Sequence, residues 1–328
     1  MSSGVLRALL LAVAVAIAHF SAAAQTFRGG ISGTINDDAG SAITGAGVKI
    51  TSKATGATRN AETGKNGEFV IPELPLGFYT VEVGKAGFQT ARVNDVEVVV
   101  STNTSVNLQL KVAAVTETVE ISAASVVRID TASTALTGII GPKQVQELPL
   151  NGRDFRQMIQ LTPGVAGTST SINGSRTRGN NYQIDGADNN DAFQNTSAVN
   201  QGGVSGIAGT LLPVEAIDQF SVLNNGSAEI GRNSGGAVNL VIKSGTNDLH
   251  GSAYYFNRNE ALAANSPVRT GLPVRKVRNH QYGFSLGGPI IKNKTFYFLT
   301  FEGQRAKAAN SELGTVPSTA WINQALPL

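Results

Sequence analysis

The residue types that most often carry catalysis or bind metals are scarce in this sequence. Its 328 residues include no Cys, and His occurs only at His19, His250 and His280. The lack of Cys excludes a disulfide scaffold, thiolate zinc and iron–sulfur sites, and a Cys nucleophile. Three scattered His residues argue against a His-based triad or a metallohydrolase centre.

Two spacings could still bind an ion or a phosphate. Asp185, Asp188 and Asp191 repeat at every third position, but no register supplies both the Gly and the Glu of an EF-hand loop. The alternative is a loop of turns capped by Asp side chains. A Gly-Lys pair precedes Asn66, where a phosphate-binding loop needs Ser or Thr. We therefore expect no enzyme activity, no cofactor and no metal.

Charged and aromatic residues are concentrated near the end of the chain. The net charge is only +3, and 15% of the residues are charged. Residues 250–328 hold nine Lys and Arg against three Asp and Glu, and ten of the twenty aromatic residues. These basic residues lie among turns and aromatic strands, without the clustering on one helix or groove that is typical of nucleic-acid binding. We expect no nucleic-acid partner.

The N-terminus has the features of a secretory signal. Arg7 supplies the positive charge, residues 8–18 are apolar, and an Ala-x-Ala site predicts cleavage between Ala24 and Gln25. The apolar run is too short for a membrane-spanning helix, which needs about twenty residues. The alternative is a buried N-terminal helix. We expect a signal peptide over 1–24 and export of the remaining chain.

Short alternating strands separated by turn residues follow, over 25–112. This pattern predicts a small antiparallel β-sandwich, with a hairpin turn at 63–67 around an Asn-Gly pair. The runs T-G-K-N-G-E-F-V-I-P-E-L-P-L-G-F-Y-T-V-E-V and K-A-G-F resemble the carboxypeptidase regulatory-like, or transthyretin-like, domain. The resemblance implies a rigid β-module for interaction or a spacer, and the family name does not imply peptidase activity. The expected strands cover 31–35, 48–50, 68–71, 78–83, 96–100 and 106–110.

The segment 113–123 is extended, β-branched and poorly charged, which suits it to strand addition on a partner. Its T-E-T-V-E-I-S-A run resembles the TonB box of TonB-dependent outer-membrane transporters, which implies a TonB-type energy-transducing partner in the periplasm. The alternative is a last strand of the first module followed by a linker. The box-like residues are Thr116, Glu117, Thr118, Val119, Glu120, Ile121, Ser122 and Ala123.

Residues 124–248 are rich in Gly, Asn and Ser. Helices are expected at 144–148 and 154–161, the second ended by a Pro-Gly pair. A long turn-rich stretch follows over 168–209. Strands are expected again at 216–223 and 237–243.

Five ordered blocks of this region resemble the plug domain of TonB-dependent transporters: L-P-L-N-G-R-D-F, L-T-P-G-V, R-G-N-N-Y-Q-I-D-G, V-E-A-I-D-Q-F-S-V and A-E-I-G-R-N-S-G-G-A-V-N-L-V-I-K-S-G-T-N. After a regulatory-like module, they resemble the Oar-like or SusC-like subgroup. The Gly-Gly pair in the last block predicts close backbone packing. The stretch 224–227 lacks the Lys-Gly pair of the plug pattern, so no ligand or coupling detail is carried over there. The motif residues are Arg178, Gly179, Asp185, Gly186, Gly231, Gly235, Gly236 and Lys243.

The final region, 249–328, has the pattern of outer-membrane strands. The segment 280–287 alternates, with Tyr282, Phe284 and Leu286 on one face and polar or small residues on the other, as expected for an apolar exterior and a polar interior. The run G-G-P-I-I-K-N-K-T-F-Y-F resembles a hairpin of the transporter barrel. The alternative is a soluble β-sandwich, whose strands also alternate.

Two further strands, at 250–258 and 295–302, and a basic loop at 259–279 complete this region. The loop is expected to be external and solvated, and contact with anionic lipopolysaccharide or an acidic ligand is a second interpretation. Three strands cannot close a barrel, and an open edge in lipid leaves backbone groups unpaired. We therefore expect the chain to be the N-terminal part of a larger receptor.

The expected fold is mainly β: a transthyretin-like β-sandwich, an α+β plug and the first strands of a transmembrane β-barrel. The resemblance implies energised uptake of a ligand such as a siderophore or oligosaccharide across a Gram-negative outer membrane. It also implies contact with outer-membrane lipid and lipopolysaccharide and with a surface lipoprotein. The competing function is a structural or adhesion and secretion-associated barrel whose β-sandwich binds carbohydrate or protein. A secreted soluble β-protein is the third class.

Overall fold

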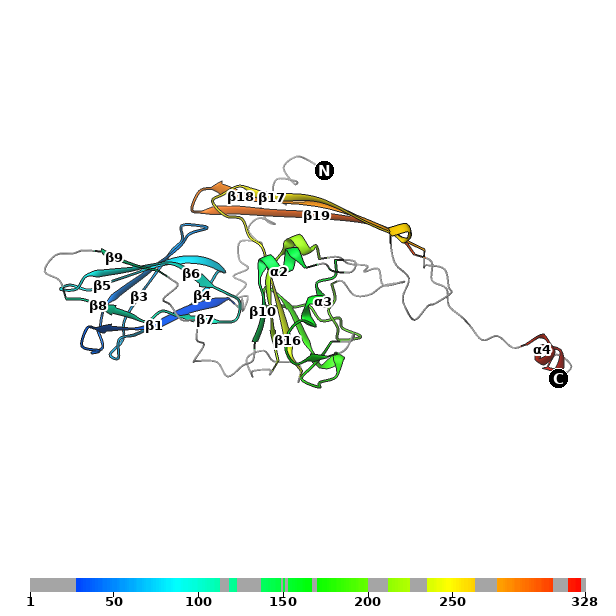
Figure 1. Ribbon diagram of the computed structural model, residues 1–328, viewed down its shortest axis with the longest axis horizontal. Coiled ribbons are helices and arrows are strands. Elements are labelled where there is room, and N and C mark those ends of the chain that lie inside the picture. Colours follow the sequence, from blue (N-terminus) through cyan, green and yellow to red (C-terminus); the bar gives the residue numbers. More distant parts are fainter. Residues whose placement is uncertain are drawn as a thin grey trace, which may run out of the picture.

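The computed structural model describes three regions of the chain. The described residues are 28–112, 118–122, 137–148, 150, 153–166, 170–199, 212–224, 235–262, 276–308 and 318–325. They form a β-sandwich, a second sheet with short helices, and a long three-stranded sheet along the top of Figure 1. This is the mainly β architecture expected from the sequence. The predicted signal peptide and its cleavage site at Ala24 and Gln25 lie outside the described residues.

The first module is a sandwich of two sheets. In one sheet β4 pairs antiparallel with β1, and β7 and β8 pair parallel with β1. The other sheet has the order β3-β2-β5-β6-β9. Alternate apolar residues, among them Ile31, Ile50 and Val81, are fully buried between the sheets. The strands are β1 (Gly29–Asp37), β2 (Gly47–Ser52), β3 (Thr58–Glu62), β4 (Glu68–Leu74), β5 (Gly77–Gly84), β6 (Thr90–Val98), β7 (Asn103–Ser105), β8 (Leu108–Leu110) and β9 (Thr118–Ser122).

Two details of this module differ from the prediction. The sandwich is mixed rather than antiparallel, because β7, β8 and β9 run parallel to their partners. The turn at 63–67 does not close a hairpin, since β3 pairs with β2 and β4 pairs with β1. Gly67 does have a positive φ of 70°, but its carbonyl accepts the Ile35 N–H at 2.8 Å. This bond joins the turn to β1, directly next to the β1–β4 ladder.

The second region contains a five-stranded sheet with the order β10-β15-β16-β13-β14. One of its faces is apolar: Phe220 and Leu240 on this face, and Phe155 and Met158 at α3, are fully buried together. The rings of Phe155 and Phe220 meet edge to face, with centroids 6.4 Å apart. The elements are β10 (Thr137–Ile140), α2 (Pro142–Glu147), α3 (Arg156–Ile159), β11 (Val165–Ala166), β12 (Ser171–Ile172), η2 (Thr177–Gly179), β13 (Asn181–Ile184), β14 (Ala187–Asp188), η4 (Val214–Ala216), β15 (Ile217–Leu223) and β16 (Ala237–Ile242).

The local structure of this region departs from the sequence prediction at three points. α2 begins at Pro142, in the first-turn position that proline favours, rather than at 144. α3 has four residues instead of covering 154–161, and a turn around Gly164, with φ 80°, follows it. The turn-rich stretch 168–209 includes β13, a strand inside the sheet. Its pairing with the distant β16 defines this strand, and four residues are too few for a periodicity signal.

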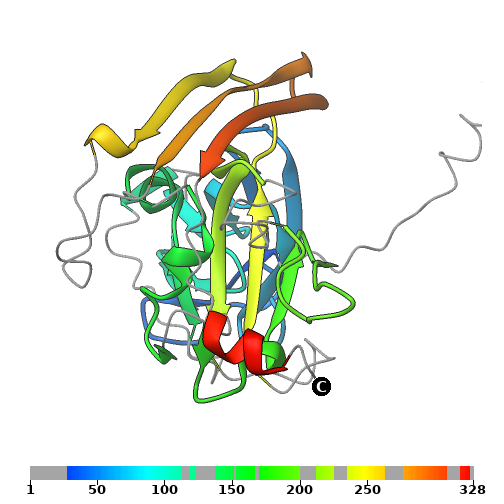
Figure 2. The ribbon, with the colours of Figure 1, turned by 90° about the vertical axis from the view of Figure 1, so that its right-hand side faces the viewer.

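The last region is an antiparallel sheet in the order β17-β18-β19. Figure 2 shows these strands lying over the top of the second region. Among the described residues, no helix combines the length and apolar composition needed to cross a membrane. The elements are β17 (His250–Asn259), η5 (Glu260–Leu262), β18 (Val277–Ile291), β19 (Thr295–Ala308) and α4 (Thr319–Ala325).

Candidate functional site

The two faces of the long sheet differ in polarity. On β18, Tyr282, Phe284 and Leu286 are 38–41% exposed, whereas Gln281 and Ser285, which alternate with them, are buried. This confirms the alternation predicted from the sequence. Residues of β17 and β19 that stand opposite the exposed ones in the ladder extend the same face. We call it the apolar face, made up of Tyr255, Tyr282, Phe284, Leu286, Leu299 and Phe301.

The opposite, polar face of the long sheet carries hydrogen bonds between strands. The Tyr254 hydroxyl donates to Glu302 Oε2 at 2.7 Å, and the hydroxyls of Ser252 and Ser285 lie 2.9 Å apart. Gly283 stands between Tyr254 and Glu302 in the ladder, and a Cβ there would lie 2.5 Å from the Tyr254 hydroxyl. A glycine at this position therefore makes room for the tyrosine ring.

Arg153 connects the second region to this polar face. Its guanidinium lies over the rings of Tyr254 and Phe256, at 4.8 Å and 4.2 Å from their centroids. Its Nη2 donates to Glu215 Oε1 at 3.0 Å, and neither side chain of the pair is more than 14% exposed. The backbone of Arg153 has φ 56°, which is uncommon for a residue other than glycine. A nearly dry ion pair on a strained residue marks a specific contact between the two sheets.

The sequence prediction did not include this contact. Arg153 and Glu215 lie in two of the plug-like blocks, L-P-L-N-G-R-D-F and V-E-A-I-D-Q-F-S-V. The blocks therefore contained the right residues, but spacing along the chain does not show which charges meet in space.

The motif glycines lie where backbone segments approach closely. The Gly235 N–H donates to Gly179 O at 2.8 Å, and a Cβ on Gly235 would stand 2.5 Å from that oxygen. A Cβ on Gly236 would collide with the side chain of Ile172. Both positions thus require glycine for packing, the physical role expected from the sequence.

The other motif residues are distributed around this contact. Arg178 lies in η2 next to Gly179, and its carbonyl accepts from Asn195 Nδ2 at 2.5 Å. Gly231 lies outside the described residues. The structure therefore brings the R-G block and the Gly-Gly pair together. The hydrogen bond described for Arg178 involves its backbone carbonyl and not its side chain.

Asp185 and Gly186 form the tight turn between β13 and β14. Their φ values are 49° and 81°, both positive as a type I′ turn requires. One carboxylate oxygen of Asp185 accepts the Ile242 N–H at 3.1 Å, which ties the turn to the end of β16. Burial raises the pKa of Asp185, although this hydrogen bond acts in the opposite direction. The D-G block is therefore a structural turn.

Lys243 follows β16 and lies near the acidic partner of Arg153. Its N–H donates to Ala216 O at 2.8 Å. Burial lowers the pKa of Lys243, and the nearby Glu215 and Asp218 carboxylates counteract that shift. The C-terminal end of the last plug-like block thus adds a second cation beside Glu215.

The spaced aspartates make local turns. Asp188 Oδ1 accepts the Asn190 N–H at 3.0 Å, and Asp191 Oδ1 accepts the Phe193 N–H at 3.0 Å. These are Asx turns, the alternative to an ion site. Among the residues that the structure describes, no group of three or more His, Asp or Glu is placed to hold a metal ion.

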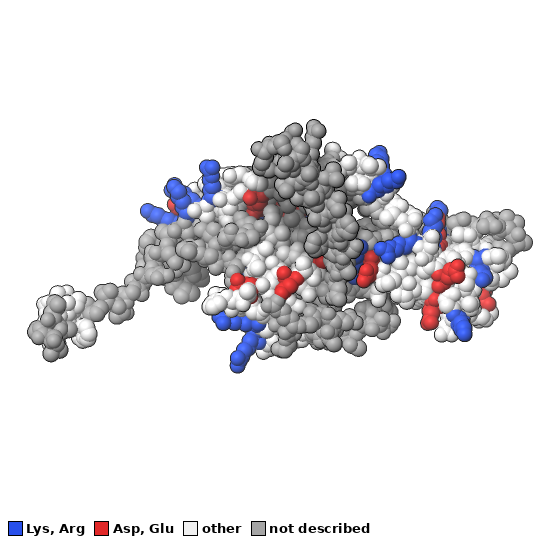
Figure 3. Space-filling model, turned by 180° about the vertical axis from the view of Figure 1, so that it is seen from behind, with Lys and Arg blue, Asp and Glu red and all other residues white. Residues whose placement is uncertain are grey.

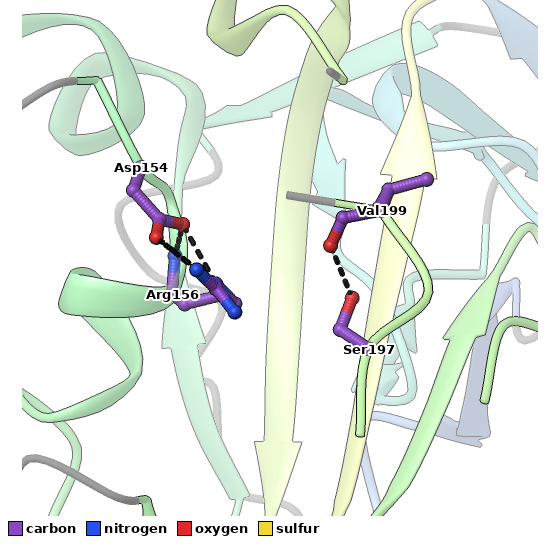
Figure 4. A network of polar contacts seen from close by, with 4 residues as sticks. All are labelled: Asp154, Arg156, Ser197 and Val199. Atoms are coloured by element: carbon purple, nitrogen blue, oxygen red, sulfur yellow. Dashed lines mark hydrogen bonds and ion pairs between the residues drawn. The ribbon is translucent and has the colours of Figure 1, made fainter. Parts of the chain in front are cut away.

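Two more local contacts shape the loops of this region (Figure 4). Arg156 Nε lies 3.0 Å from both carboxylate oxygens of Asp154, whose Oδ1 also accepts the Arg156 N–H at 3.0 Å. Ser197 Oγ donates to the Val199 carbonyl at 2.9 Å. Each contact joins residues two positions apart, so both order the chain locally.

The candidate TonB box lies on the first module. Residues 118–122 form β9, which pairs with β6 at the edge of the five-stranded sheet of the sandwich. Thr116, Glu117 and Ala123 lie outside the described residues. The segment is thus a last strand of the first module, as the alternative interpretation holds, and its coupling role stays a prediction.

One turn of the first module contacts the sheet of the second region. Val100 is fully buried, and its N–H donates to Gln219 Oε1 at 3.2 Å. The hydroxyls of Ser101 and Ser221 lie 3.2 Å apart. Gln219 and Ser221 alternate with the apolar residues of β15, so this turn packs on the face opposite the core.

A second contact joins the first module to one end of the long sheet. The Asn247 N–H donates to Ala54 O at 2.9 Å. Asn247 and Asn293 exchange hydrogen bonds of 2.7 Å and 2.8 Å, and Asn293 belongs to the short turn between β18 and β19. The first module therefore lies at the same end of the long sheet as this short turn (Figure 1).

Two family profiles match the sequence. The carboxypeptidase regulatory-like domain matches residues 30–111, which is the β-sandwich. The outer membrane beta barrel domain matches residues 241–325, which include the long sheet.

Two curated proteins and one solved structure are similar to parts of this chain. The TonB-dependent transporter Oar of Myxococcus xanthus is 29% identical over 274 residues, 77% of this chain. The ferrienterobactin receptor of Escherichia coli K12 is 29% identical over 183 residues, 51% of the chain. Each match covers 24% of the relative, so the chain spans about a quarter of their length. The solved siderophore receptor PirA from Acinetobacter baumannii is 24% identical, with a TM-score of 0.39 over 55% of this chain and 26% of that one.

The domain matches and the curated relatives support the same protein class and the same cellular location. A regulatory-like sandwich precedes outer-membrane barrel sequence, and the curated relatives carry transporter or receptor names. The chain is thus a relative of the TonB-dependent receptors, located in the outer membrane of a Gram-negative bacterium.

Proposed function

We propose that the chain serves the energised uptake of a small ligand across the outer membrane. The observation that carries this proposal is the long sheet, which exposes its apolar face and holds its polar face against the second region through Arg153. Such a sheet suits a barrel wall with lipid outside and a plug inside. In this proposal the domains are 25–112 for the sandwich, 113–123 for the coupling segment, 124–248 for the plug and 249–328 for the first wall strands.

The proposed ligand is a siderophore or an oligosaccharide captured on the outer side. One relative is named a ferrienterobactin receptor and another, from Acinetobacter baumannii, a probable TonB-dependent siderophore receptor, which favours a siderophore. No covalent step is proposed. The resemblance to the SusC-like subgroup makes a surface lipoprotein a further proposed partner.

The proposed energy-coupling partner is a TonB-type protein in the periplasm. Barrels have short turns on the periplasmic side and longer loops outside. Asn247 connects the first module to the short turn at Asn293, and under this rule the contact supports a periplasmic position for the module and β9. A box on β9 is then within reach of a periplasmic partner.

The proposed lipid partner is the outer leaflet of the outer membrane. At the end of the long sheet remote from the short turn, Arg278, Arg305 and Lys307 continue the apolar face beyond Tyr255 and Tyr282 in the ladder. They line a hollow of about 930 Å³. Figure 3 shows Lys and Arg gathered at the upper left, over this end of the strands. Cations above an aromatic belt suit the phosphates of lipopolysaccharide.

Deletion of residues 116–123 tests the uptake function. We expect ligand-dependent growth to collapse while the protein stays in the outer membrane at normal amounts. The matched control deletes 124–131, which shortens the same connection by the same length and leaves the box intact. Unchanged uptake without the box would favour the runner-up, a structural or adhesion and secretion-associated barrel whose β-sandwich binds carbohydrate or protein.

A further inference from the structure

Two buried polar residues lie side by side in the sheet of the second region, where the first module contacts it. Ser221 of β15 and Asn239 of β16 stand opposite each other in the antiparallel ladder, so their side chains project from the same face. Both residues are almost fully buried. The first module reaches this face at Ser101, whose hydroxyl lies 3.2 Å from that of Ser221. Asn239 is therefore buried directly beside the contact.

The carboxamide of Asn239 is unpaired. Neither its Nδ2 nor its Oδ1 has a hydrogen-bond partner in the part of the chain that the structure describes. A buried amide in this state has lost its hydrogen bonds to water and has gained none in exchange, which is unfavourable. The closed contact thus carries a cost that is located at one side chain.

The interactions that hold the contact closed are few. Val100 is fully buried, and its N–H donates to Gln219 Oε1 at 3.2 Å. The hydroxyls of Ser101 and Ser221 add a second hydrogen bond of 3.2 Å, and both distances are at or beyond the upper end of the usual range. When the contact opens, water can pair with all of these polar groups. The unpaired amide therefore offsets much of what one valine and two long hydrogen bonds contribute.

We propose that this contact is a latch that opens while both sheets stay folded, and that Asn239 determines how readily it opens. Opening brings water to Gln219, Ser221 and Asn239. The other face of the same sheet, with Phe220 and Val222, stays packed in its core. The proposal goes beyond the uptake function and does not depend on it, because it concerns the protein without ligand.

The opposite model is that Asn239 strengthens the closed contact, for example through a bridging water molecule. The two models predict opposite signs when the amide is removed. In the latch model the contact opens less often without the amide. In the opposite model it opens more often.

Thiol labelling of the full chain in detergent measures the opening. The chain has no Cys, so Ser221→Cys introduces a single thiol under the contact. Val222→Cys, the matched control, introduces one on the core face of the same strand. We expect the thiol at 221 to react at least about 10-fold faster, since it needs only the latch to open, whereas the thiol at 222 needs the core to open. Equal rates would overturn the proposal.

Substitutions at Asn239 test its role in the latch. Asn239→Leu replaces the amide by an apolar group of the same shape, and Asn239→Ala removes it without added bulk. Combined with Ser221→Cys, each should slow the labelling at least about 5-fold. Gln219→Leu is the comparison of opposite sign: it removes the acceptor of the Val100 N–H, so it should speed the labelling by a similar factor.

Unchanged or faster labelling in both Asn239 variants, with the expected acceleration in Gln219→Leu, would show that the amide does not weaken the contact and would overturn the proposal. A lower melting temperature in both Asn239 variants would overturn it as well, because the amide would then stabilise the fold. The proposed function is tested separately: a contact that stays closed leaves uptake standing, and a chain without uptake can still have the latch.

Discussion

Arg153 keeps a charge where water is nearly excluded. Its partner Glu215 and the rings of Tyr254 and Phe256 replace the solvent around its guanidinium. A buried ion pair of this kind adds little to the free energy of unfolding compared with an apolar pair. Removing one member of the pair, however, leaves the other charge buried without a partner. The contact between the plug-like region and the long sheet should therefore tolerate the loss of both charges better than the loss of one.

Replacing Arg153 with Met should lower the free energy of unfolding by up to about 3–5 kcal/mol, because Glu215 loses its ion-pair partner and keeps only Lys243 as a nearby cation. The double variant Arg153→Met with Glu215→Gln should recover most of this loss. Urea unfolding in detergent measures both. Arg156→Met is the matched control, since its pair with Asp154 is more exposed and should cost about 1 kcal/mol or less. Additive losses in the double variant would show that the two charges do not depend on each other.

The glycines give a second prediction at this scale. Gly236→Ala should lower the melting temperature and cost about 1–3 kcal/mol, because its Cβ collides with Ile172 in the core. Gly141→Ala, at the start of α2, is the control, since nothing lies within 4 Å of a Cβ there. Equal melting temperatures for the two variants would contradict the packing argument.

These residues show which contacts of single side chains can be predicted from the sequence and which cannot. The Gly-Gly pair was recognisable because a motif of two glycines predicts close packing whatever the partner is. The partner of Arg153 could not be recognised from the sequence, because Glu215 lies in a separate block and only the fold brings the two residues together. The same limit applies to Val100 and Gln219.

At the scale of elements, the long strands were predictable and several short ones were not. The alternation of Tyr282, Phe284 and Leu286 is a local signal, since every second residue faces the same side. β7 and β13 have three and four residues and exist through parallel pairing with distant strands. No local pattern encodes such partners, which is also why the turn at 63–67 was wrongly expected to close a hairpin.

The apolar face makes an element-scale prediction. If it faces lipid, Phe284→Lys should reduce stability in membranes by about 2–4 kcal/mol near the midplane, whereas Phe284→Leu should be nearly neutral. The fraction of protein that resists unfolding in a heat-modifiability gel, after membrane extraction, measures this. A Lys variant as stable as the Leu variant would place Phe284 in water and favour a soluble sheet.

At the scale of the whole molecule, the first module touches both other regions through small contacts. The turn at Val100 and Ser101 lies on β15, and Ala54 accepts from Asn247 beside the short turn of the long sheet. Single turns of this kind bury little surface, and limited interfaces allow domains to move relative to each other. The module is thus positioned next to the plug-like sheet without being fixed to it.

This arrangement predicts that uptake moves the first module against the plug-like sheet. Ser101→Cys with Ser221→Cys should form a disulfide in the oxidising periplasm, since the two hydroxyls are 3.2 Å apart and the chain has no other Cys. We expect the cross-linked receptor to bind ligand normally but to lose most uptake, because the plug cannot rearrange while tied to the module. Each single variant is a control, and reduction should restore uptake. Full uptake in the completely cross-linked protein would instead mean that module and plug-like sheet move as one body, so that a force applied at β9 reaches the sheet through this contact.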